Sequence, residues 1–213
     1  MKTKYLIGAG LMCLSSAVLC TNAITPERKM LEAALETYLA QHGNFCLGKF
    51  DWPVEVSESE FKMRTRNAIQ LPVLQKAGLV AASKAVAIRK QDGIEQSVPV
   101  IRYALTDAGK KYYIRKEIPE STPDGNKLVK RKDLCAAKLS PDKIVRWNKP
   151  RMVAGHEETT LSYTYKITAP PWSQNLQVQQ VFPMLARIMQ GAGTLQLQQR
   201  FRLVGDAWVA VIP

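Results

Sequence analysis

The sequence predicts an α+β protein made of two halves. Three observations indicate this class: helical and hairpin patterns fill the first half, a Pro-, Ser-, Thr- and Gly-rich segment follows, and alternating apolar residues then return. We therefore expect a helical and hairpin domain over residues 24–118 and a linker over residues 119–127. A small antiparallel sheet with one helix is expected over residues 128–213.

Residues 1–23 are expected to form a cleavable signal peptide. Lys2 and Lys4 precede an uncharged apolar run over residues 5–20, and Ala23 suits the cleavage site. An uncleaved anchor is one alternative, disfavoured because the run is shorter than the roughly twenty residues that span a bilayer. Lipidation is another, disfavoured because a bulky residue precedes each cysteine of the segment. We therefore expect a periplasmic or secreted protein.

Cys46 and Cys135 are the cysteines that remain once the signal is removed. Two cysteines in an oxidising compartment predict one disulfide with a single connectivity. Closing a loop of about ninety residues would remove roughly 4–5 kcal/mol of unfolded-state entropy. Two buried free thiols are the alternative. No further ligand-type residue stands at metal-binding spacing from either cysteine, so we do not expect a metal here.

The first helix is expected over residues 25–43. Thr25 suits the N-cap, Pro26 suits the first turn, and Gly43 ends the helix. The helix must pack on a core, because its apolar residues share one face: Met30, Leu31, Ala34, Leu35, Tyr38 and Leu39.

A short strand and two helices are expected next. Residues 50–56 indicate an edge strand, because they include a proline. Ser57 and Glu60 form a capping box for a helix that runs to about residue 69. A second short helix is expected over residues 71–80, ended by a glycine.

A hairpin and a final short helix complete the first half. Residues 84–90 and 94–105 are rich in Val and Ile and are joined by the turn sequence "QDG". Thr106 then suits the N-cap of a helix that begins at Asp107.

This order of elements resembles a winged-helix domain. The residues that carry the resemblance are Leu71, Leu74, Gly78, Leu79, Val80, Tyr103, Leu105, Thr106 and Gly109. The resemblance implies DNA contacts from the helix and the hairpin, which would nominate Lys62, Arg64, Arg66, Lys84, Arg89 and Lys90. Because an exported domain does not meet the chromosome, we take over the fold alone and do not favour nucleic acid as the partner.

The second half is expected to alternate strands around one helix. Residues 159–168 place apolar and aromatic side chains on one face, as a half-buried strand does. The expected elements are strands over 142–148 and 159–168, a helix over 173–190 with a kink at Pro183, and strands over 194–203 and 207–212.

The chain is strongly basic, with 30 Lys and Arg against 18 Asp and Glu. Between Lys110 and Arg151 the ratio of basic to acidic residues is higher, thirteen against five. Such a stretch attracts anionic partners, although a merely solvated surface is the alternative. The residues that we nominate for partner binding are Lys127, Lys130, Arg131, Lys132, Arg146, Lys149 and Arg151.

The sequence contains no catalytic or cofactor motif that we can identify. His156 in "GHEE" lacks the second histidine of a metalloprotease helix, so we predict no catalytic residue, cofactor or metal. A carboxylate pair assembled in three dimensions would escape detection. A hydrolase or sugar-modifying enzyme of the cell envelope, with a cleft between the halves, therefore stays an alternative.

The hypothesis that the sequence favours is a non-enzymatic protein that binds an acidic protein or an anionic envelope component. A membrane surface is a further candidate partner, and a structural or assembly subunit of an envelope complex is a further alternative. Among the aromatic residues, we select Trp172 as the one to be exposed for an interface, with core packing as its alternative.

Overall fold

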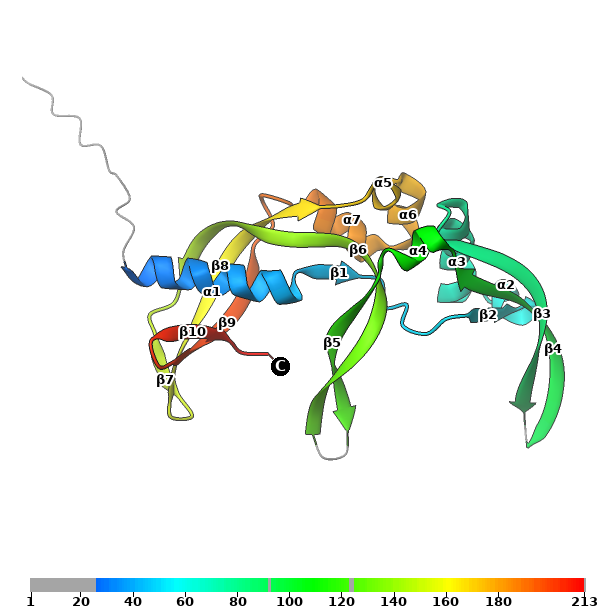
Figure 1. Ribbon diagram of the computed structural model, residues 1–213, viewed down its shortest axis with the longest axis horizontal. Helices are drawn as coiled ribbons and strands as arrows, with labels where there is room; N and C mark the ends of the chain where they lie inside the picture. Colours follow the sequence, from blue (N-terminus) through cyan, green and yellow to red (C-terminus); the bar gives the residue numbers. More distant parts are fainter. Residues whose placement is uncertain (1–25, 92, 123–124, 213) are drawn as a thin grey trace, which may run out of the picture.

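The computed structural model describes residues 26–91, 93–122 and 125–212. The expected signal peptide lies outside the described residues. The described part of the chain is mostly β, with a curled antiparallel sheet. It is elongated, with helix α1 at one end, a small three-stranded sheet at the other, and a hairpin that projects between them (Figure 1).

The larger sheet has seven strands. Its main path runs β1-β6-β8-β9-β10, while β5 pairs with β6 and β7 pairs with β8. All of these pairs are antiparallel. The strands are β1 (Asn44–Cys46), β5 (Tyr113–Thr122), β6 (Gly125–Trp147), β7 (Arg151–Val153), β8 (His156–Thr168), β9 (Leu197–Val204) and β10 (Ala207–Ala210).

Helix α1 (Pro26–His42) packs on this sheet. Its Leu31 and Leu35 are buried in one core with Leu161 and Phe201 of the sheet. Gly43 lets the helix end approach β6 closely, because a Cβ there would lie 2.4 Å from the carbonyl oxygens of Leu39 and Leu139. The amphipathic helix that we predict over residues 25–43 therefore forms and covers the sheet.

The smaller sheet has the order β2-β4-β3 and carries three helices. The capping box of Ser57 and Glu60 is present at the start of α2. The elements are β2 (Val54–Ser57), α2 (Glu58–Lys62), α3 (Arg66–Lys76), β3 (Val80–Gln91), β4 (Ile94–Leu105) and α4 (Asp107–Lys110). Among the described strands β3 pairs with β4 alone, so β3 is an edge strand, and its Val86 and Ile88 are exposed.

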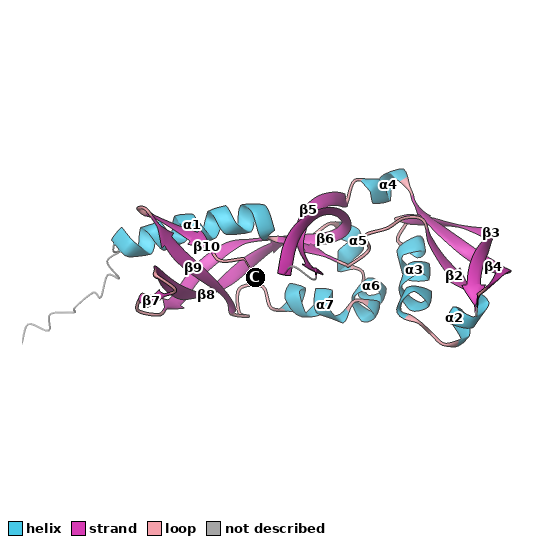
Figure 2. Cartoon of the chain, turned by 90° about the horizontal axis from the view of Figure 1, so that it is seen from below, coloured by secondary structure: helices cyan, strands magenta, loops and turns pink. Residues whose placement is uncertain are grey.

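Three short helices replace the single helix that we expect over residues 173–190. They are α5 (Pro171–Gln174), α6 (Leu176–Val181) and α7 (Pro183–Gln190). Pro183 begins α7 instead of kinking a continuous helix, because proline suits the first turn. The amide of Gln70 in α3 donates to the carbonyl of Val181 at 2.8 Å, and α3, α6 and α7 lie in a row (Figure 2).

The prediction of a winged-helix-like first half and a separate sheet-and-helix second half is wrong. The protein is mostly β, and its first helix is followed by strand β1, which joins the large sheet. The physical reason lies in what covers α1: its apolar face is buried against β8, β9 and β10 of the second half. Periodicity predicts a buried face but not the element that covers it.

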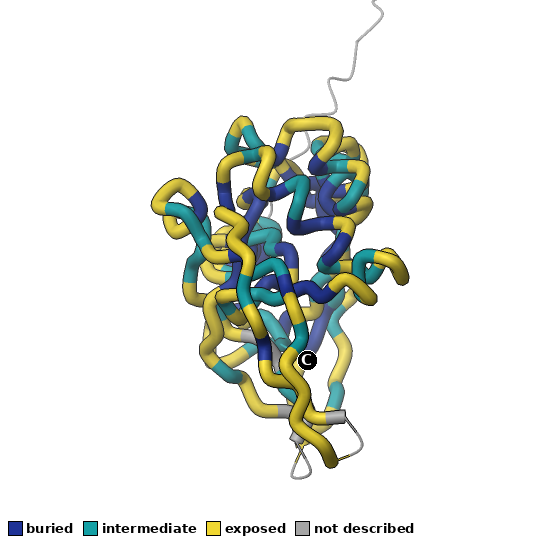
Figure 3. Tube along the Cα trace, turned by 90° about the vertical axis from the view of Figure 1, so that its right-hand side faces the viewer, coloured by how far each residue is buried: buried dark blue, intermediate teal, exposed yellow. Residues whose placement is uncertain are grey.

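Two strands occupy the segment where we predict a linker. Residues 119–122 end β5, and residues 125–127 begin β6, so the segment is the tip of a hairpin. Its Pro, Asp and Gly residues are typical of turns as well as of linkers. The ends of the projecting hairpins are mostly exposed, while buried residues concentrate in the body (Figure 3).

The predicted disulfide is confirmed. Cys46 in β1 and Cys135 in β6 are bonded, and they are directly opposite each other in the strand register. Neighbouring Leu134 and Ala136 belong to the core that contains α3, α6 and α7, whereas Leu139 belongs to the core under α1. The bond therefore lies between the two cores, and it fits an oxidising compartment.

None of the helices in the described ranges is long and apolar enough to cross a membrane.

Removing the disulfide should lower stability without changing the sheet. We expect the double variant Cys46→Ala/Cys135→Ala to lose about 2–5 kcal/mol in the free energy of unfolding, because the unfolded chain regains the freedom of a long loop. Urea unfolding measures the change. Equal unfolding midpoints for the wild type, with and without reductant, would contradict the bond.

Candidate functional site

The strands β5 and β6 form a strongly charged hairpin, which we call the basic hairpin (residues 113–122 and 125–134). It pairs from Tyr113 opposite Leu134 at its root to Thr122 opposite Gly125 at its tip. Between residues 115 and 132 the sequence contains six Lys and Arg and three Asp and Glu. The hairpin projects from the body (Figure 1). It therefore presents an excess of positive charge to the surroundings.

Two pairs of like charges lie directly across the basic hairpin. Arg115 is opposite Lys132, and Lys116 is opposite Arg131. Like charges in directly opposed positions destabilise a strand pair, by about 0.2–1 kcal/mol relative to neutral pairs. Other contacts offset part of this cost, since Arg131 lies 3.4 Å from Glu120 and Lys132 lies over the ring of Tyr113. An anion bound between the cations of either pair would relieve the remaining repulsion. The charge pattern therefore favours an anion-binding role for the hairpin.

Two exposed ion pairs lie within the described part of the basic hairpin. Lys130 lies 3.8 Å from Glu117, and Arg131 lies 3.4 Å from Glu120. All four side chains are more than two-fifths exposed, and such pairs contribute about 0–1 kcal/mol because water screens them. An incoming anion can therefore compete with either glutamate for its basic partner.

The root of the basic hairpin is held by buried polar contacts. The carboxylate of Asp133 accepts hydrogen bonds from the backbone amides of Gly48, at 3.1 Å, and Lys49, at 2.7 Å. Burial raises the pKa of Asp133, although these two hydrogen bonds oppose the shift. The hydroxyl of Tyr113 donates to the carbonyl of Phe50. The direction of the hairpin is thus fixed relative to the body.

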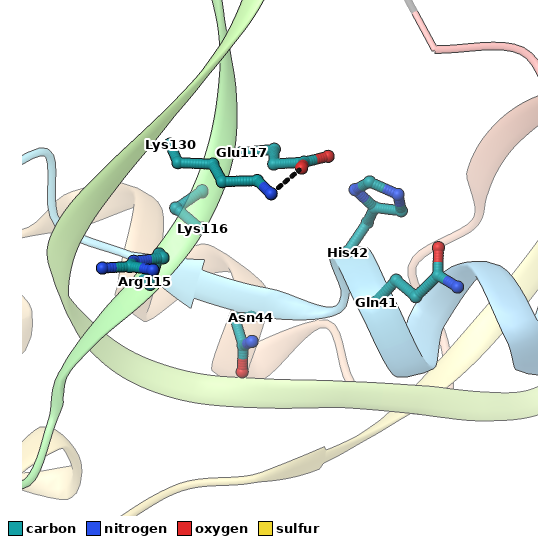
Figure 4. Close-up of a pocket in the computed structure, with 7 residues that line it drawn as sticks. All are labelled: Gln41, His42, Asn44, Arg115, Lys116, Glu117 and Lys130. Carbon is teal, nitrogen blue, oxygen red and sulfur yellow. Dashed lines mark ion pairs between the residues drawn. The ribbon is translucent and has the colours of Figure 1, made fainter.

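A cleft of about 510 Å³ lies where the basic hairpin meets the end of α1. Figure 4 shows the side chains that surround it, with His42 at the end of α1 facing Glu117 and Lys130 of the hairpin. Three cations line the cleft against one carboxylate among its described residues. The lining residues are Gln41, His42, Asn44, Arg115, Lys116, Glu117 and Lys130.

The structure divides the seven basic residues that the sequence nominates into two groups. Lys130 lines the cleft, and Lys127, Arg131 and Lys132 lie elsewhere on the basic hairpin. The second group is near the far end of β6 and in β7, around a small cavity of about 50 Å³ that Lys149 and Arg151 help to line. Arg146 belongs to that far end of β6.

The second basic group surrounds a buried acid. Glu158 is only 3% exposed, and its Oε1 accepts hydrogen bonds from Nε and Nη2 of Arg202 at 2.9 and 2.8 Å. Arg200 lies 3.6 Å from the other carboxylate oxygen. Part of the positive charge at this end therefore has a buried partner, whereas Lys130 of the cleft pairs with the more exposed Glu117.

Trp172 is half-buried rather than fully exposed. Its ring meets Tyr112 edge to face at 5.5 Å, and it packs against the core that contains α3. The proline-flanked sequence predicts a loop, but residue 172 lies in α5, whose helical turn directs the indole inward.

Arg115, Lys116 and His42 are the cleft residues with a basic side chain that the sequence does not nominate. The two basic residues precede the predicted linker, and only the strand register shows that they face Lys132 and Arg131. His42 joins them because α1 ends at β1, beside the hairpin. Basic and acidic residues stand on both sides of the turn sequence "PDG", and this is the signal that could have revealed the pairing of β5 with β6.

The cleft does not contain the clustered carboxylates that the enzyme alternative predicts, since Glu117 is the one acid among its described lining residues. The described residues also include no cluster of three or more His, Cys, Asp or Glu side chains arranged to hold a metal ion. Comparison with protein-family models, curated proteins and solved structures finds no match.

A buried lysine lies beside the root of the basic hairpin. Lys49 is 5% exposed, and its amine donates to the side-chain carbonyl of Asn67. Burial, helped by the positive charge of Arg66, lowers the pKa of Lys49 to about 8, while Asp133 opposes the shift. The folded protein therefore gives up this proton at a lower pH than the unfolded chain does.

This difference predicts a rise in stability with pH. Between pH 8 and the unfolded pKa of 10.5, the unfolded chain binds the Lys49 proton and the folded protein does not. The free energy of unfolding should therefore increase, by about 1–2 kcal/mol from pH 7 to pH 9.5. Urea unfolding of the wild type and of Lys49→Met measures the effect. The rise should be missing in the variant, and equal slopes would contradict the assignment.

Reversing one charge of the hairpin should stabilise it. We expect Arg115→Glu to raise the free energy of unfolding by about 0.2–1 kcal/mol at low salt, because Lys132 then has an opposite charge across the strands. The gain should shrink at high salt, where exposed charges are screened. Arg115→Ala, which removes the repulsion alone, should fall between the two proteins. A destabilised Arg115→Glu protein would count against the repulsion.

Proposed function

We propose that this protein is an exported, non-enzymatic binding protein that takes an anionic partner into the basic hairpin and the cleft at its root. The observation that carries the proposal is the opposition of like charges, Arg115 with Lys132 and Lys116 with Arg131, on a hairpin with a fixed root; Arg115, Arg131 and Lys132 are exposed and Lys116 is partly exposed. The two pairs lie on opposite faces of the hairpin, and an anionic group between the cations of either pair removes a repulsion that the free protein bears.

The chemistry of the cleft supports carboxylate or phosphate groups as the bound anions. Arg115 offers a planar guanidinium that can hold either group through two parallel hydrogen bonds. Lys116 and Lys130 add two flexible point charges from the same cleft. Acidic proteins and anionic envelope polymers both present such groups in series, and a projecting hairpin can reach them without a deep pocket.

Export to the periplasm or the cell exterior is part of the proposal. The charge and length pattern of residues 1–23 supports a cleaved signal peptide. The bond between Cys46 and Cys135 supports an oxidising compartment.

Matched charge reversals at the two basic groups test the site. We expect Arg115→Glu/Lys116→Glu/Lys130→Glu to weaken binding of fluorescein-labelled polyglutamate or polyphosphate at least tenfold, because it inverts the charge of the cleft. The control is Arg146→Glu/Lys149→Glu/Arg151→Glu, which changes the net charge equally at the other end of β6. Fluorescence anisotropy at low and physiological salt gives the Kd.

The control separates a site from general attraction. If both triple variants lose the same affinity, net charge alone is responsible and the proposal is wrong. If polyglutamate binding is lost and polyphosphate binding is kept, or the reverse, the bound anion is narrowed to one chemical group.

A further inference from the structure

An apolar groove adjoins the cationic cleft. It lies between α1 and the edge strand β10, with a volume of about 520 Å³. Gln41 and His42 line both the groove and the cleft, so the two cavities meet at the end of α1. The groove residues that carry the argument are Met30, Ala33, Ala34, Ala207, Val209 and Ile212.

The groove exposes apolar surface that a ligand could cover. Met30 is 38% exposed and Val209 is 50% exposed, although both are large apolar side chains. Alanines at positions 33, 34 and 207 keep the groove open between helix and strand. Along α1, the lining residues extend from Met30 to His42, which is roughly 18 Å of helix at 1.5 Å per residue. An elongated apolar chain fits this shape better than a compact ligand does.

An aromatic pair stands at the boundary between the two cavities. The rings of Tyr38 and His42 stack with their centroids 5.2 Å apart. Tyr38 lines the groove, while His42 lines both cavities. Beyond His42 the lining changes from apolar to cationic, with Arg115, Lys116 and Lys130 against Glu117. The joint cavity is thus mostly apolar along one part, where Asp206 is the one acid among the described lining residues, and positively charged at the other.

We infer that this joint cavity binds an anionic amphiphile, an acyl chain that ends in a carboxylate or phosphate group. The head group lies in the cleft among Arg115, Lys116 and Lys130, and the chain lies along the groove beside Met30 and Val209. The inference rests on the proposed function, since it names the ligand class of the same cationic cleft. Each cavity is of a size usual for small-ligand sites, about 300–1,000 Å³.

Ligands that carry only one part of the amphiphile test the joint use of both cavities. Decanoate and decyl phosphate should bind, as measured by isothermal titration. Acetate and inorganic phosphate, which lack the chain, and decyl glucoside, which lacks the charge, should bind more weakly. From octanoate to decanoate the affinity should rise by about fourfold per methylene, because each one adds buried apolar surface. Affinity that does not depend on chain length would overturn the inference.

Two pairs of matched variants locate the ligand. Ala33→Trp fills the groove and should weaken decanoate binding about tenfold or more, whereas Ala40→Trp places the same side chain on an exposed position of α1 outside the groove. Arg115→Glu should weaken binding about tenfold, because it removes a charged partner of the head group. Arg146→Glu is its control, because it makes the same charge change at the far end of β6 and does not line the cleft.

The outcomes separate this inference from the proposed function. If polyglutamate or polyphosphate binds through the cleft while decanoate and decyl phosphate bind no better than acetate and phosphate, the amphiphile is excluded and the proposed function stands. If decanoate binds but Ala33→Trp and Ala40→Trp behave alike, the chain does not lie in the groove and the inference is wrong. If no anion binds the wild type, both are wrong.

Discussion

Strand β6 is the element on which the rest of the structure depends. It pairs with β5 at its start, with β1 in its middle and with β8 toward its end. Leu134 lies in the core that contains α3, and Ile144 lies in the core under α1, so one backbone belongs to both. The bond from Cys135 to Cys46 secures this strand at the passage between the cores. The basic hairpin is an extension of the same strand, which is why a charged, exposed element has a defined direction.

Local patterns predict the local elements well and their long-range partners poorly. Helix α1, the capping box at Ser57, the hairpin of β3 and β4, and the disulfide follow from residue types at short spacing or from cysteine number. The winged-helix-like half is wrong because α1 finds its partner strands more than a hundred residues away. The β5–β6 pair is missed because charged residues stand at consecutive positions and so lie on both of its faces, which leaves no apolar period to mark the strands.

The positive charge of the candidate site could be predicted from the sequence, but the set of residues that line it could not. Composition places positive charge in the right stretch of chain, and Lys130 is both nominated and part of the cleft. Arg115 lines the cleft because of the register of β5 with β6, and His42 lines it because α1 ends beside the hairpin. Both are features of the tertiary structure. Arg146, nominated by the same charge count, lies instead at the far end of β6. Because β6 has 23 residues, charged residues that are near in sequence lie at opposite ends of an extended strand. Nearness in sequence is therefore a poor guide to nearness in space where a strand is long.

The exposed edge of β3 has a consequence for how copies of this protein meet. A twelve-residue edge strand with Val86 and Ile88 at its surface is a template for pairing with a second chain. Lys84, Arg89 and Lys90 are part of the same strand, so two edges brought together would confront cation with cation. Electrostatic repulsion between the two basic edge strands therefore disfavours pairing of β3 with β3 of a second copy. Salt weakens this repulsion, and a strand with acidic side chains would not be repelled.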